Sequence, residues 1–362
     1  MPLLQDQIMT ALRTVEDPDL KQDLVSLGMI QDLVVNQSSV AFTLVLTTPA
    51  CPLQEMLKKA CIDAIHTHVA TNLEVAIHLT AQVTSMRTHD SVLPQVKNII
   101  AIASGKGGVG KSTVAVNMAV ALAQFGAQVG LLDADIFGPS IPTMLGCERK
   151  RPQVTQQAGK NYLVPIENHG IKLLSMGLLA PADDAMVWRG PMASKALRQM
   201  LGDTIWGALD YLFIDLPPGT SDIHLTLVQA VPVTGAVIVT TPQQVALVDA
   251  TKAQAMFQKT GIDVPILGVV ENMAYFTSPE LPNNKYYLFG QEGGKAFATQ
   301  HQVPFLGQIP LVPNICEGGD IGIPAVLEKS ASTFNQVATA LVQQVAIRNA
   351  RVAPTQTVER IR

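Results

Sequence analysis

The feature that most constrains this chain is the stretch IASGKGGVGKSTVAVN at residues 102–117. Residues 105–112 match the pattern G-x-x-x-x-G-K-[ST], directly after an apolar run and directly before a helical pattern. Glycines let the backbone approach phosphate groups closely, and the amides at a helix N-terminus form a nest for anions. The stretch therefore predicts a strand, a phosphate-binding loop and a helix, in that order.

Separate residues of this loop are expected to contact separate parts of a nucleotide. Lys111 supplies positive charge to the β and γ phosphates, the Ser112 hydroxyl ligates Mg²⁺, and Thr113 reaches the α-phosphate. The other residues of the loop contribute backbone amides. The predicted phosphate-binding set is Gly105, Lys106, Gly107, Gly108, Val109, Gly110, Lys111, Ser112 and Thr113.

Two apolar runs downstream end on aspartates. The run LLDAD ends at Asp135, and YLFID ends at Asp215. A carboxylate at the end of a strand beside a phosphate loop suits the outer coordination shell of Mg²⁺, and we assign this Walker-B role to Asp215. Asp135 is then the candidate for orienting the attacking water. The alternative for both is a solvated carboxylate at a strand end.

The segments around the loop predict an α/β fold. From about residue 98, six short and nearly continuous apolar runs alternate with segments that can form helices. Strands buried on both faces have this composition, which indicates a mostly parallel sheet with helices on both faces. Ligands of such sheets bind at the carboxyl ends of the strands.

The pattern before this region is different and divides the chain. Residues 1–88 combine a helical run, alternating strands and a second helix, which predicts a small α+β domain. Residues 89–97 are expected to be a linker, residues 98–346 the nucleotide-binding domain, and residues 347–362 a flexible tail.

Composition narrows the class of protein. Hydrophobic residues make up 48% of the 362 residues and charged residues 15%, so a well-buried globular protein is expected. The net charge of −4 gives no sign of a nucleic-acid or membrane partner. No apolar run approaches the roughly 18 residues of a membrane span, and the start lacks a basic leader segment. We therefore expect a cytoplasmic protein whose four cysteines, none in a C-x-x-C pair, are free thiols.

The loop has a second lysine, Lys106, whose side chain should point away from the phosphates of its own subunit. It could instead stabilise charge on the nucleotide of a neighbouring subunit, as an arginine finger does. Residues 106–113, KGGVGKST, resemble the deviant Walker A motif of the family that includes MinD, ParA and the nitrogenase iron protein. The resemblance implies an ATP-dependent homodimer in which Lys106 acts across the interface and Asp135 is the catalytic carboxylate.

Longer motifs resemble one branch of that family, the Mrp/ApbC group of ATP-binding iron–sulfur cluster carriers. They are DADIFGPSIPTMLG, VWRGPMASKALRQML, YLFIDLPPGTSDIHLTL and VVENMAYF. The resemblance implies that Asn272 contacts adenine and that residues 307–324 close over the base. In the first 88 residues, DPDLKQDLVSLGMIQDLVV and TTPACPLQEM resemble the PaaD-like domain of iron–sulfur assembly proteins. The implied partners are apo iron–sulfur proteins and assembly scaffold proteins.

The chain departs from the group at one place. The group usually carries C-P-x-C after the ENMxYF segment, so that a dimer offers four thiolates to a [4Fe–4S] cluster. Here the two positions are Ser278 and Leu281. Three outcomes follow: a cluster bound through other thiols, iron–sulfur work by protein contact alone, or loss of the cluster role.

The four cysteines differ in what their positions suggest. Cys51 precedes a proline and is expected at a helix N-cap, where amides and the helix dipole lower the pKa of a thiol. It also matches the reactive cysteine of the PaaD-like domain. Cys61 is expected in the core, and Cys147 follows the segment of Asp135. Cys316 lies in the stretch that resembles the base-covering segment, where it could act as a cluster ligand across the two-fold axis.

The main interpretation is an ATPase that carries or inserts iron–sulfur clusters. A regulatory or positioning switch like MinD and ParA, with no cluster, is the alternative that the missing C-P-x-C favours. A third interpretation, electron transfer like that of the nitrogenase iron protein, requires cluster cysteines that Ser278 and Leu281 do not provide. The C-terminal helical stretch has few basic residues, which argues against membrane targeting.

Overall fold

The computed structural model describes residues 2–87, 92–179, 189–278, 280–328 and 332–358. Its backbone divides into two compact units. The first unit comprises Met1–Thr84 and Ala346–Val352, and the second comprises Ser85–Val345 and Ala353–Arg362.

The first unit is a small α+β domain built on a three-stranded sheet. Strand β4 is central, with β3 antiparallel on one side and β5 parallel on the other. Helices α1 and α2 pack against each other, and their apolar residues form a core with alternate residues of β4. The elements are α1 (Pro2–Leu12), β1 (Glu16–Asp17), β2 (Gln22–Asp23), β3 (Ile30–Val35), β4 (Ser39–Leu46), α2 (Gln54–His68) and β5 (Glu74–Ala81).

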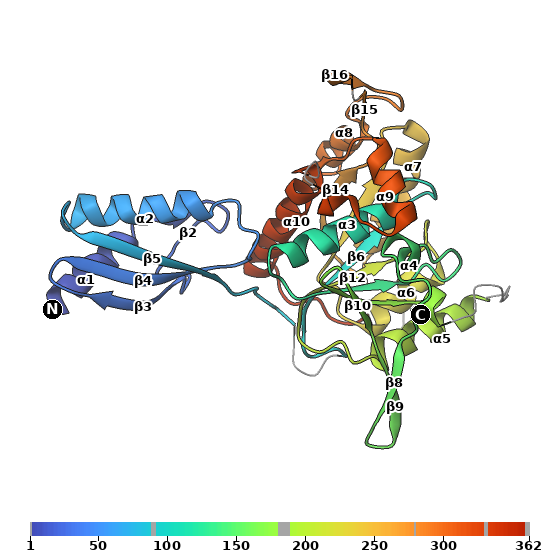
Figure 1. Cartoon of the computed structure of the whole chain (residues 1–362), viewed down its shortest axis with the longest axis horizontal. Coiled ribbons are helices and arrows are strands. Elements are labelled where there is room, and N and C mark those ends of the chain that lie inside the picture. Colours follow the sequence, from blue (N-terminus) through green and yellow to red (C-terminus); the bar gives the residue numbers. More distant parts are fainter. Residues whose placement is uncertain (1, 88–91, 180–188, 279, 329–331, 359–362) are drawn as a thin grey trace. The chain divides into compact units, whose positions relative to one another are not determined.

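The second unit contains an eight-stranded sheet flanked by helices (Figure 1). The strand order is β10-β11-β7-β12-β6-β13-β14-β17, and every pairing is parallel except that of the edge strand β10. The sheet strands are β6 (Val96–Ala103), β7 (Val129–Asp133), β10 (Ile166–Asn168), β11 (Ile171–Ser175), β12 (Leu209–Asp215), β13 (Gly235–Thr240), β14 (Ile266–Glu271) and β17 (Phe305–Gln308). This arrangement confirms the predicted fold class.

The helices and two short hairpins complete this unit. The helices are α3 (Lys111–Gln124), α4 (Ile141–Met144), η1 (Met176–Leu178), α5 (Gly190–Gly202), α6 (Asp222–Ala230), α7 (Gln244–Gln258), α8 (Gly293–Gln300), α9 (Pro313–Ile321), η2 (Ala325–Leu327) and α10 (Ser332–Arg351). The hairpins pair β8 (Gln153–Gln157) with β9 (Lys160–Val164), and β15 (Phe276–Ser278) with β16 (Leu281–Tyr286).

The apolar runs seen in the sequence are the buried strands of the sheet. All six residues of β13 and of β14 are buried, as are all five of β7. Helices shield both faces of a parallel sheet from water, so each strand needs apolar side chains on both sides. The carboxyl ends of β6, β7 and β12 consequently meet at one edge of the sheet, where the phosphate loop begins.

The predicted linker and tail differ from the structure at their ends. Strand β6 begins at Val96, inside the expected linker. The expected tail, 347–362, is helical up to Arg351 because its side chains have partners in the first unit. The Asn349 amide, 4% exposed, donates to the carbonyl oxygen of Thr84 at 3.1 Å, and Arg351 donates to that of Asp19. Further on, the Val358 amide donates to Val228 in the second unit.

Candidate nucleotide site

The phosphate loop lies between the end of β6 and the start of α3, as predicted. Gly110 is the residue before α3 and has a left-handed backbone, with φ of 79°. Gly105 packs so closely on α7 that a Cβ there would lie 2.0 Å from the carbonyl carbon of Asp249. Glycine is therefore required at both positions, at Gly110 by conformation and at Gly105 by space.

A cavity of about 260 Å³ opens over this loop. Its walls combine the loop with residues from the ends of β7 and β12 and from α4. The lining residues are Ser104, Lys106, Gly107, Gly108, Val109, Gly110, Lys111, Ser112, Thr113, Asp135, Ser140, Met144 and Pro218. The structure thus brings the predicted loop residues from Lys106 to Thr113 together with Asp135, whereas Gly105 is not in the lining and packs on α7.

Asp215 lies at the base of this site and binds two loop residues. Its Oδ1 is 2.7 Å from Lys111 Nζ, and its Oδ2 accepts a hydrogen bond of 2.6 Å from Ser112 Oγ. Asp215 is completely buried and Lys111 is 6% exposed. A charge buried this deeply is stable only with a partner, so the carboxylate and the ammonium hold each other in place.

A second buried carboxylate, Asp133, was not predicted from the sequence. It is the last residue of β7 and lies directly opposite Asp215 in the parallel register of β7 and β12. Burial, and then the charge of Asp215, raise the pKa of Asp133 to about 8. Ser175 Oγ donates to its Oδ2 at 2.8 Å, and the Asp135 amide donates to its Oδ1. Only the strand order, which puts β12 beside β7, identifies this pair.

Asp135 and Lys106 are at the mouth of the site. Asp135 is half-buried, and desolvation raises the pKa of its carboxyl although Lys111 acts in the opposite direction. Lys106 is exposed on the rim, and its ammonium forms no ion pair with any residue that the structure describes. Hydrolysis would need a carboxylate within the site, such as Asp135. Contact with a second subunit would need an exposed cation, such as Lys106.

Asn272 follows β14 and is 5% exposed. Its Nδ2 donates to the carbonyl oxygen of Val109 at 2.8 Å, and a Cβ on Gly110 would lie 2.2 Å from the same nitrogen. The side chain therefore contacts the phosphate loop directly. Contact between Asn272 and adenine stays a prediction.

The structure corrects the expectation for Cys51. Helix α2 begins at Gln54 with Leu53 as its N-cap, so Cys51 lies two residues before the cap. Its thiol is half-buried, and desolvation raises its pKa despite a hydrogen bond from the Leu53 amide. The predicted low pKa was wrong, because the loss of solvation on burial outweighs the hydrogen bond from the Leu53 amide.

The other thiols divide into buried and exposed. Cys61 is fully buried as predicted, and burial raises its pKa to about 12. Cys147 is also buried, with a pKa raised to about 11, and lies 3.4 Å from the carbonyl oxygen of Pro142. Cys316 is exposed on α9. Among the residues that the structure describes, no three of His, Cys, Asp and Glu gather as metal ligands.

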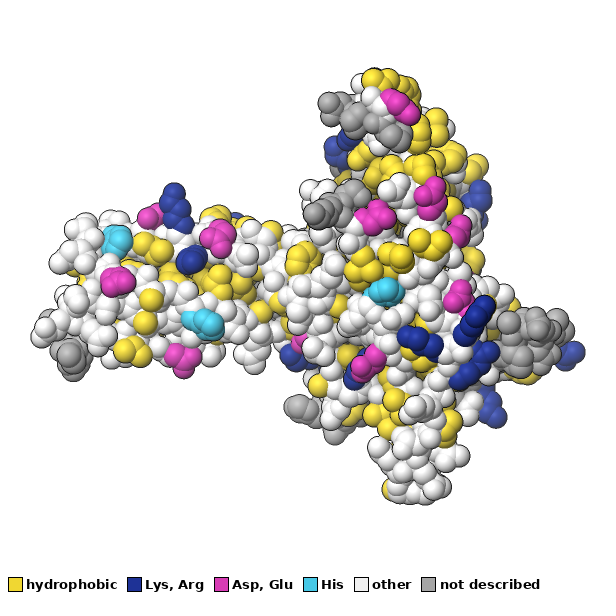
Figure 2. All heavy atoms as spheres, in the orientation of Figure 1, with side chains coloured by type: hydrophobic (Ala, Val, Ile, Leu, Met, Phe, Trp, Pro, Cys, Tyr) yellow, Lys and Arg dark blue, Asp and Glu magenta, His cyan; other side chains and the backbone are white. Residues whose placement is uncertain are grey.

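The hairpin β15–β16 occupies the place where C-P-x-C was expected. Ser278 ends β15 and its hydroxyl donates to Glu280, while Leu281 starts β16 and is half exposed. Tyr286, Tyr287 and Leu288 are exposed nearby, and Figure 2 shows hydrophobic side chains at the end of the second unit that carries these strands. The described hairpin residues provide no thiolate.

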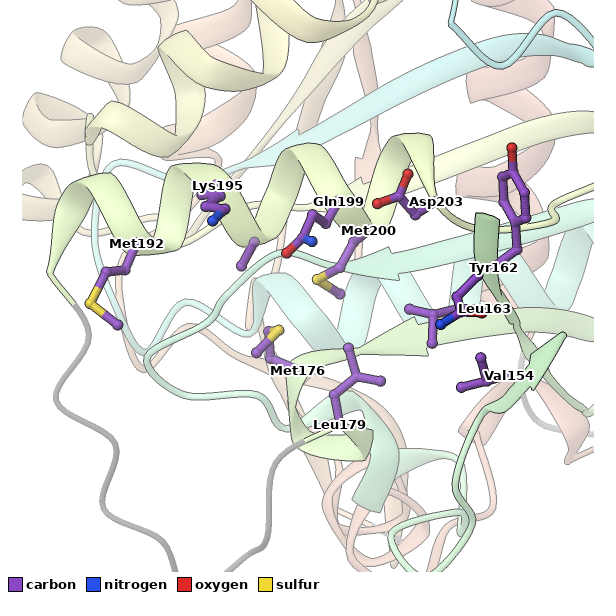
Figure 3. Close-up of a pocket in the computed structure, with 12 residues that line it drawn as sticks. Val154, Tyr162, Leu163, Met176, Leu179, Met192, Lys195, Gln199, Met200 and Asp203 are labelled. Atoms are coloured by element: carbon purple, nitrogen blue, oxygen red, sulfur yellow. The ribbon is translucent and has the colours of Figure 1, made fainter. Parts of the chain in front are cut away.

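A second cavity, of about 630 Å³, lies between α5 and the β8–β9 hairpin. Met176, Leu179 and Met200 point toward one another inside it, and Lys195, Gln199 and Asp203 lie along the helix at its edge (Figure 3). None of the residues assigned to the nucleotide site lines this cavity.

Comparison with known proteins places the chain. The model of the NUBPL iron-transfer P-loop NTPase family matches residues 95–346. The chain belongs to this family. The model of an iron–sulfur cluster assembly protein matches residues 5–78. Both resemblances inferred from sequence motifs are thereby confirmed.

The sequence similarity between this P-loop NTPase and its relatives covers almost the whole chain. An "Iron-sulfur cluster carrier protein" of Synechocystis is 51% identical over 347 residues, covering 95% of this chain and 97% of the relative. A protein of the same name from Escherichia coli is 43% identical and covers 95% and 92%. A nucleotide-binding protein from Archaeoglobus fulgidus, solved with ADP, has a TM-score of 0.58 at 34% identity and covers 74% and 96%.

Membership of the P-loop NTPase family settles the class of ligand, which is a nucleotide with Mg²⁺. Ser112 Oγ and the Asp215 carboxylate are hard oxygen donors 2.6 Å apart beside Lys111, so these residues fit the ion. In the described part of this P-loop NTPase, no helix has both the length and the apolar character of a membrane span.

Proposed function

We propose that this P-loop NTPase is an ATP-hydrolysing carrier that receives iron–sulfur clusters and transfers them to apo iron–sulfur proteins, working as a homodimer. Its resemblance to proteins named iron–sulfur cluster carriers, across both units of the chain, is the observation that carries the proposal. We place the protein in the cytoplasm, where thiols stay reduced; all four cysteines are free.

The geometry of the loop supports ATP as the substrate. Lys111 pairs with Asp215, and the phosphates of ATP would draw the ammonium away from this carboxylate. Asp215 and Ser112 are then available to hold Mg²⁺, which would neutralise charge on the β and γ phosphates. Binding would therefore exchange one set of ion pairs for another, without leaving a buried charge unpaired.

Hydrolysis requires groups beyond the loop. Asp135 lines the cavity and has a raised pKa, which suits a carboxylate that orients the attacking water. The exposed Lys106 would reach the nucleotide of a second subunit and stabilise charge on the transferred phosphoryl group. Turnover would then depend on dimerisation.

The iron–sulfur cluster would be the cargo of this carrier, held by thiols that it can reach. Cys61 and Cys147 are buried with raised pKa values, which leaves the exposed Cys316 and the half-buried Cys51 as the thiols open to it. Two copies of Cys316 in a dimer would offer two thiolates, half of what a [4Fe–4S] cluster takes. The two remaining ligands would come either from Cys51 or from the recipient protein.

The alternative is an ATP-dependent switch in the manner of MinD and ParA, without a cluster. The observation in its favour is that Ser278 and Leu281 stand where two thiolates were expected. It predicts ATP-dependent dimerisation with no iron bound under any condition.

Anaerobic reconstitution with iron and sulfide tests the two functions. Iron per dimer and absorption near 400 nm would be measured for the wild type, Cys51→Ser and Cys316→Ser, with and without ATP. Cys61→Ser is a matched control, because its thiol is buried in the first unit. A stoichiometric cluster that passes to an apoprotein and is lost in one of the two variants supports the carrier. Background iron in all samples supports the switch.

A further inference from the structure

A turn far from the phosphate loop in sequence contacts two helices beside the nucleotide site. Asn168 is the last residue of β10 and His169 begins the turn to β11, and we call this pair the clasp. Asn168 Nδ2 donates to the carbonyl oxygen of Leu145, the residue after α4. His169 Nε2 lies 3.0 Å from the carbonyl oxygen of Gly322, the residue after α9. Because a carbonyl oxygen only accepts, Nε2 carries the proton.

Helix α4 forms part of the wall of the nucleotide site. Ser140, its N-cap, and Met144, its last residue, line the cavity over the phosphate loop together with Asp135. The hydrogen bond from Asn168 therefore holds the C-terminal end of a helix that contributes Ser140 and Met144 to the wall of the site.

Helix α9 is linked to the phosphate loop through the segment that precedes it. The segment before it, residues 309–311, runs along residues 271–275, with hydrogen bonds from Ile309 to Glu271 and from Leu311 to Tyr275. Asn272, within that stretch, donates to the phosphate loop at Val109. The residues after α9 are tied to α3, since the Val326 amide donates to Asn117 Oδ1 at 2.8 Å.

The ends of α4 and α9 also touch each other. A Cβ on Gly322 would lie 2.3 Å from the Cα of Gly146, and both glycines have positive φ. Helices α4 and α9 pack together along the same side of the molecule (Figure 1). The two hydrogen bonds of the clasp therefore lie on either side of a close contact between the backbones of Gly146 and Gly322. This contact leaves no room for side chains at the two positions.

The backbone of the clasp is itself unusual. His169 has φ of 47°, a left-handed conformation that costs free energy for any residue other than glycine. Its neighbour Gly170 also has a positive φ, of 78°, and the two residues form the two-residue turn that joins the antiparallel strands β10 and β11. The hairpin turn therefore fixes the backbone of His169, and its side chain adds the contact with Gly322.

We propose that the clasp positions the nucleotide site: it holds α4 and α9 together in the arrangement that binds ATP, and His169 is a positioning residue for nucleotide affinity. The inference rests on the proposed function in one respect, that the site binds ATP. Neither clasp side chain lines the cavity, so each acts through the helix end that it holds.

The test measures binding of a fluorescent, non-hydrolysable ATP analogue with Mg²⁺. His169→Gly removes the donor while relaxing the backbone, so the fold is preserved, and Asn168→Ala removes the other hydrogen bond. We expect each to weaken affinity about 3- to 10-fold, the effect of losing one hydrogen bond that favours the binding-competent arrangement. His169→Gln keeps a donor of similar reach and should restore affinity.

The double variant provides the sharper readout. Because the clasp bridges the two helix ends only while both hydrogen bonds are present, the double variant should bind about as well as each single one, whereas independent structural defects would add. His66→Ala is the matched control, since His66 Nε2 makes the same 3.0 Å contact with a carbonyl oxygen, that of Leu73, in the first unit. It should leave affinity unchanged.

The outcomes separate the two proposals. If the wild type binds the analogue but His169→Gly binds equally well, or if the two single effects add, the clasp is overturned and the proposed function stands. If the wild type does not bind the analogue at all, the proposed function falls and the clasp falls with it.

Discussion

At the residue scale, three carboxylates and one ammonium lie at the base and the edge of the nucleotide site. Asp215 is paired with Lys111, Asp133 lies opposite Asp215 in the sheet, and Asp135 is at the edge of the cavity. Burial, and then the charge of Asp215, raise the pKa of Asp133. A change in charge at the loop would therefore change the protonation of Asp133.

The buried ion pair gives the first prediction. Lys111→Met leaves the Asp215 carboxylate without its partner and should lower the free energy of unfolding by about 3 kcal/mol. The double variant Lys111→Met with Asp215→Leu removes both charges and should recover most of this loss. Urea unfolding at pH 7 measures both. Equal destabilisation in the single and double variants would contradict the prediction.

The raised pKa of Asp133 predicts a dependence of stability on pH. The unfolded carboxyl loses its proton near its ordinary pKa of 3.8, whereas the folded protein retains it up to about pH 8. Between these values the folded state binds more protons, so the free energy of unfolding should fall as pH rises.

Asp133→Asn cannot ionise and still accepts the hydrogen bond from Ser175. The variant should gain stability over the wild type as pH rises from 5 to 8. Urea unfolding with EDTA across this range provides the comparison. Parallel pH profiles for the two proteins would show that Asp133 ionises normally.

Thiol exposure yields a third prediction. Cys316 is exposed, whereas burial raises the pKa values of Cys51, Cys61 and Cys147. Because the thiolate is the reactive form, a disulfide reagent at pH 8 should label one thiol per chain in its fast phase. Cys316→Ser should abolish that phase. A fast phase that persists in this variant would place the reactive thiol elsewhere.

At the element scale, the shape of the loop depends on the helix packed behind it. The backbone of α7 at Asp249 and Ala250 fills the space beside Gly105. Ordered contacts of this kind fix where the loop amides point, which is what an anion site requires. The loop is therefore positioned by α7 as well as by β6 and α3.

Two glycine substitutions separate this packing from general effects of added bulk. Gly105→Ala would place a Cβ 2.0 Å from the Asp249 carbonyl carbon and should destabilise the fold by about 1–3 kcal/mol. A Cβ at Gly107 would lie 3.8 Å from Pro218 Cγ, an ordinary contact, so Gly107→Ala is the matched control. Thermal unfolding would rank them, and equal melting temperatures would refute the packing argument.

At the scale of the whole molecule, the two units have different sheet architectures and separate hydrophobic cores. The first has a three-stranded mixed sheet and its own core, and the second has the parallel sheet with the nucleotide site. The C-terminal part of α10 belongs to the first unit, so that unit combines the N-terminal residues with a segment more than 250 residues further along the chain. The proposed dimer adds a further level, which subunit mixing can test.

Complementation between inactive variants tests the trans role of Lys106. Lys106→Ala and Asp135→Ala should each lose most ATPase activity. In a mixed dimer, the Lys106→Ala subunit keeps its own Asp135 and receives Lys106 from its partner, which rebuilds one site. An equimolar mixture should regain about a quarter of wild-type turnover, as half the dimers are mixed and each has one working site. No recovery, with mixed dimers shown to form, would contradict a lysine acting across the interface.

The sequence alone determined the local chemistry of this protein. The glycines, Lys111 and Ser112 follow from what a phosphate requires of a backbone, and the continuous apolar runs follow from burial of strands on both faces. These features depend on residues that are neighbours in the chain, so the pattern can be recognised in the amino-acid sequence without the structure.

Tertiary structure decided what depends on distant residues. The Asp133–Asp215 pairing needs the order of β7 and β12, and burial raises the pKa of the Cys51 thiol, which its place before α2 was expected to lower. The clasp of Asn168 and His169 joins residues 23 and 153 positions away, at Leu145 and Gly322. Burial and hydrogen bonding between separate segments exist only once the chain has folded, and they set the pKa values and the geometry on which function depends.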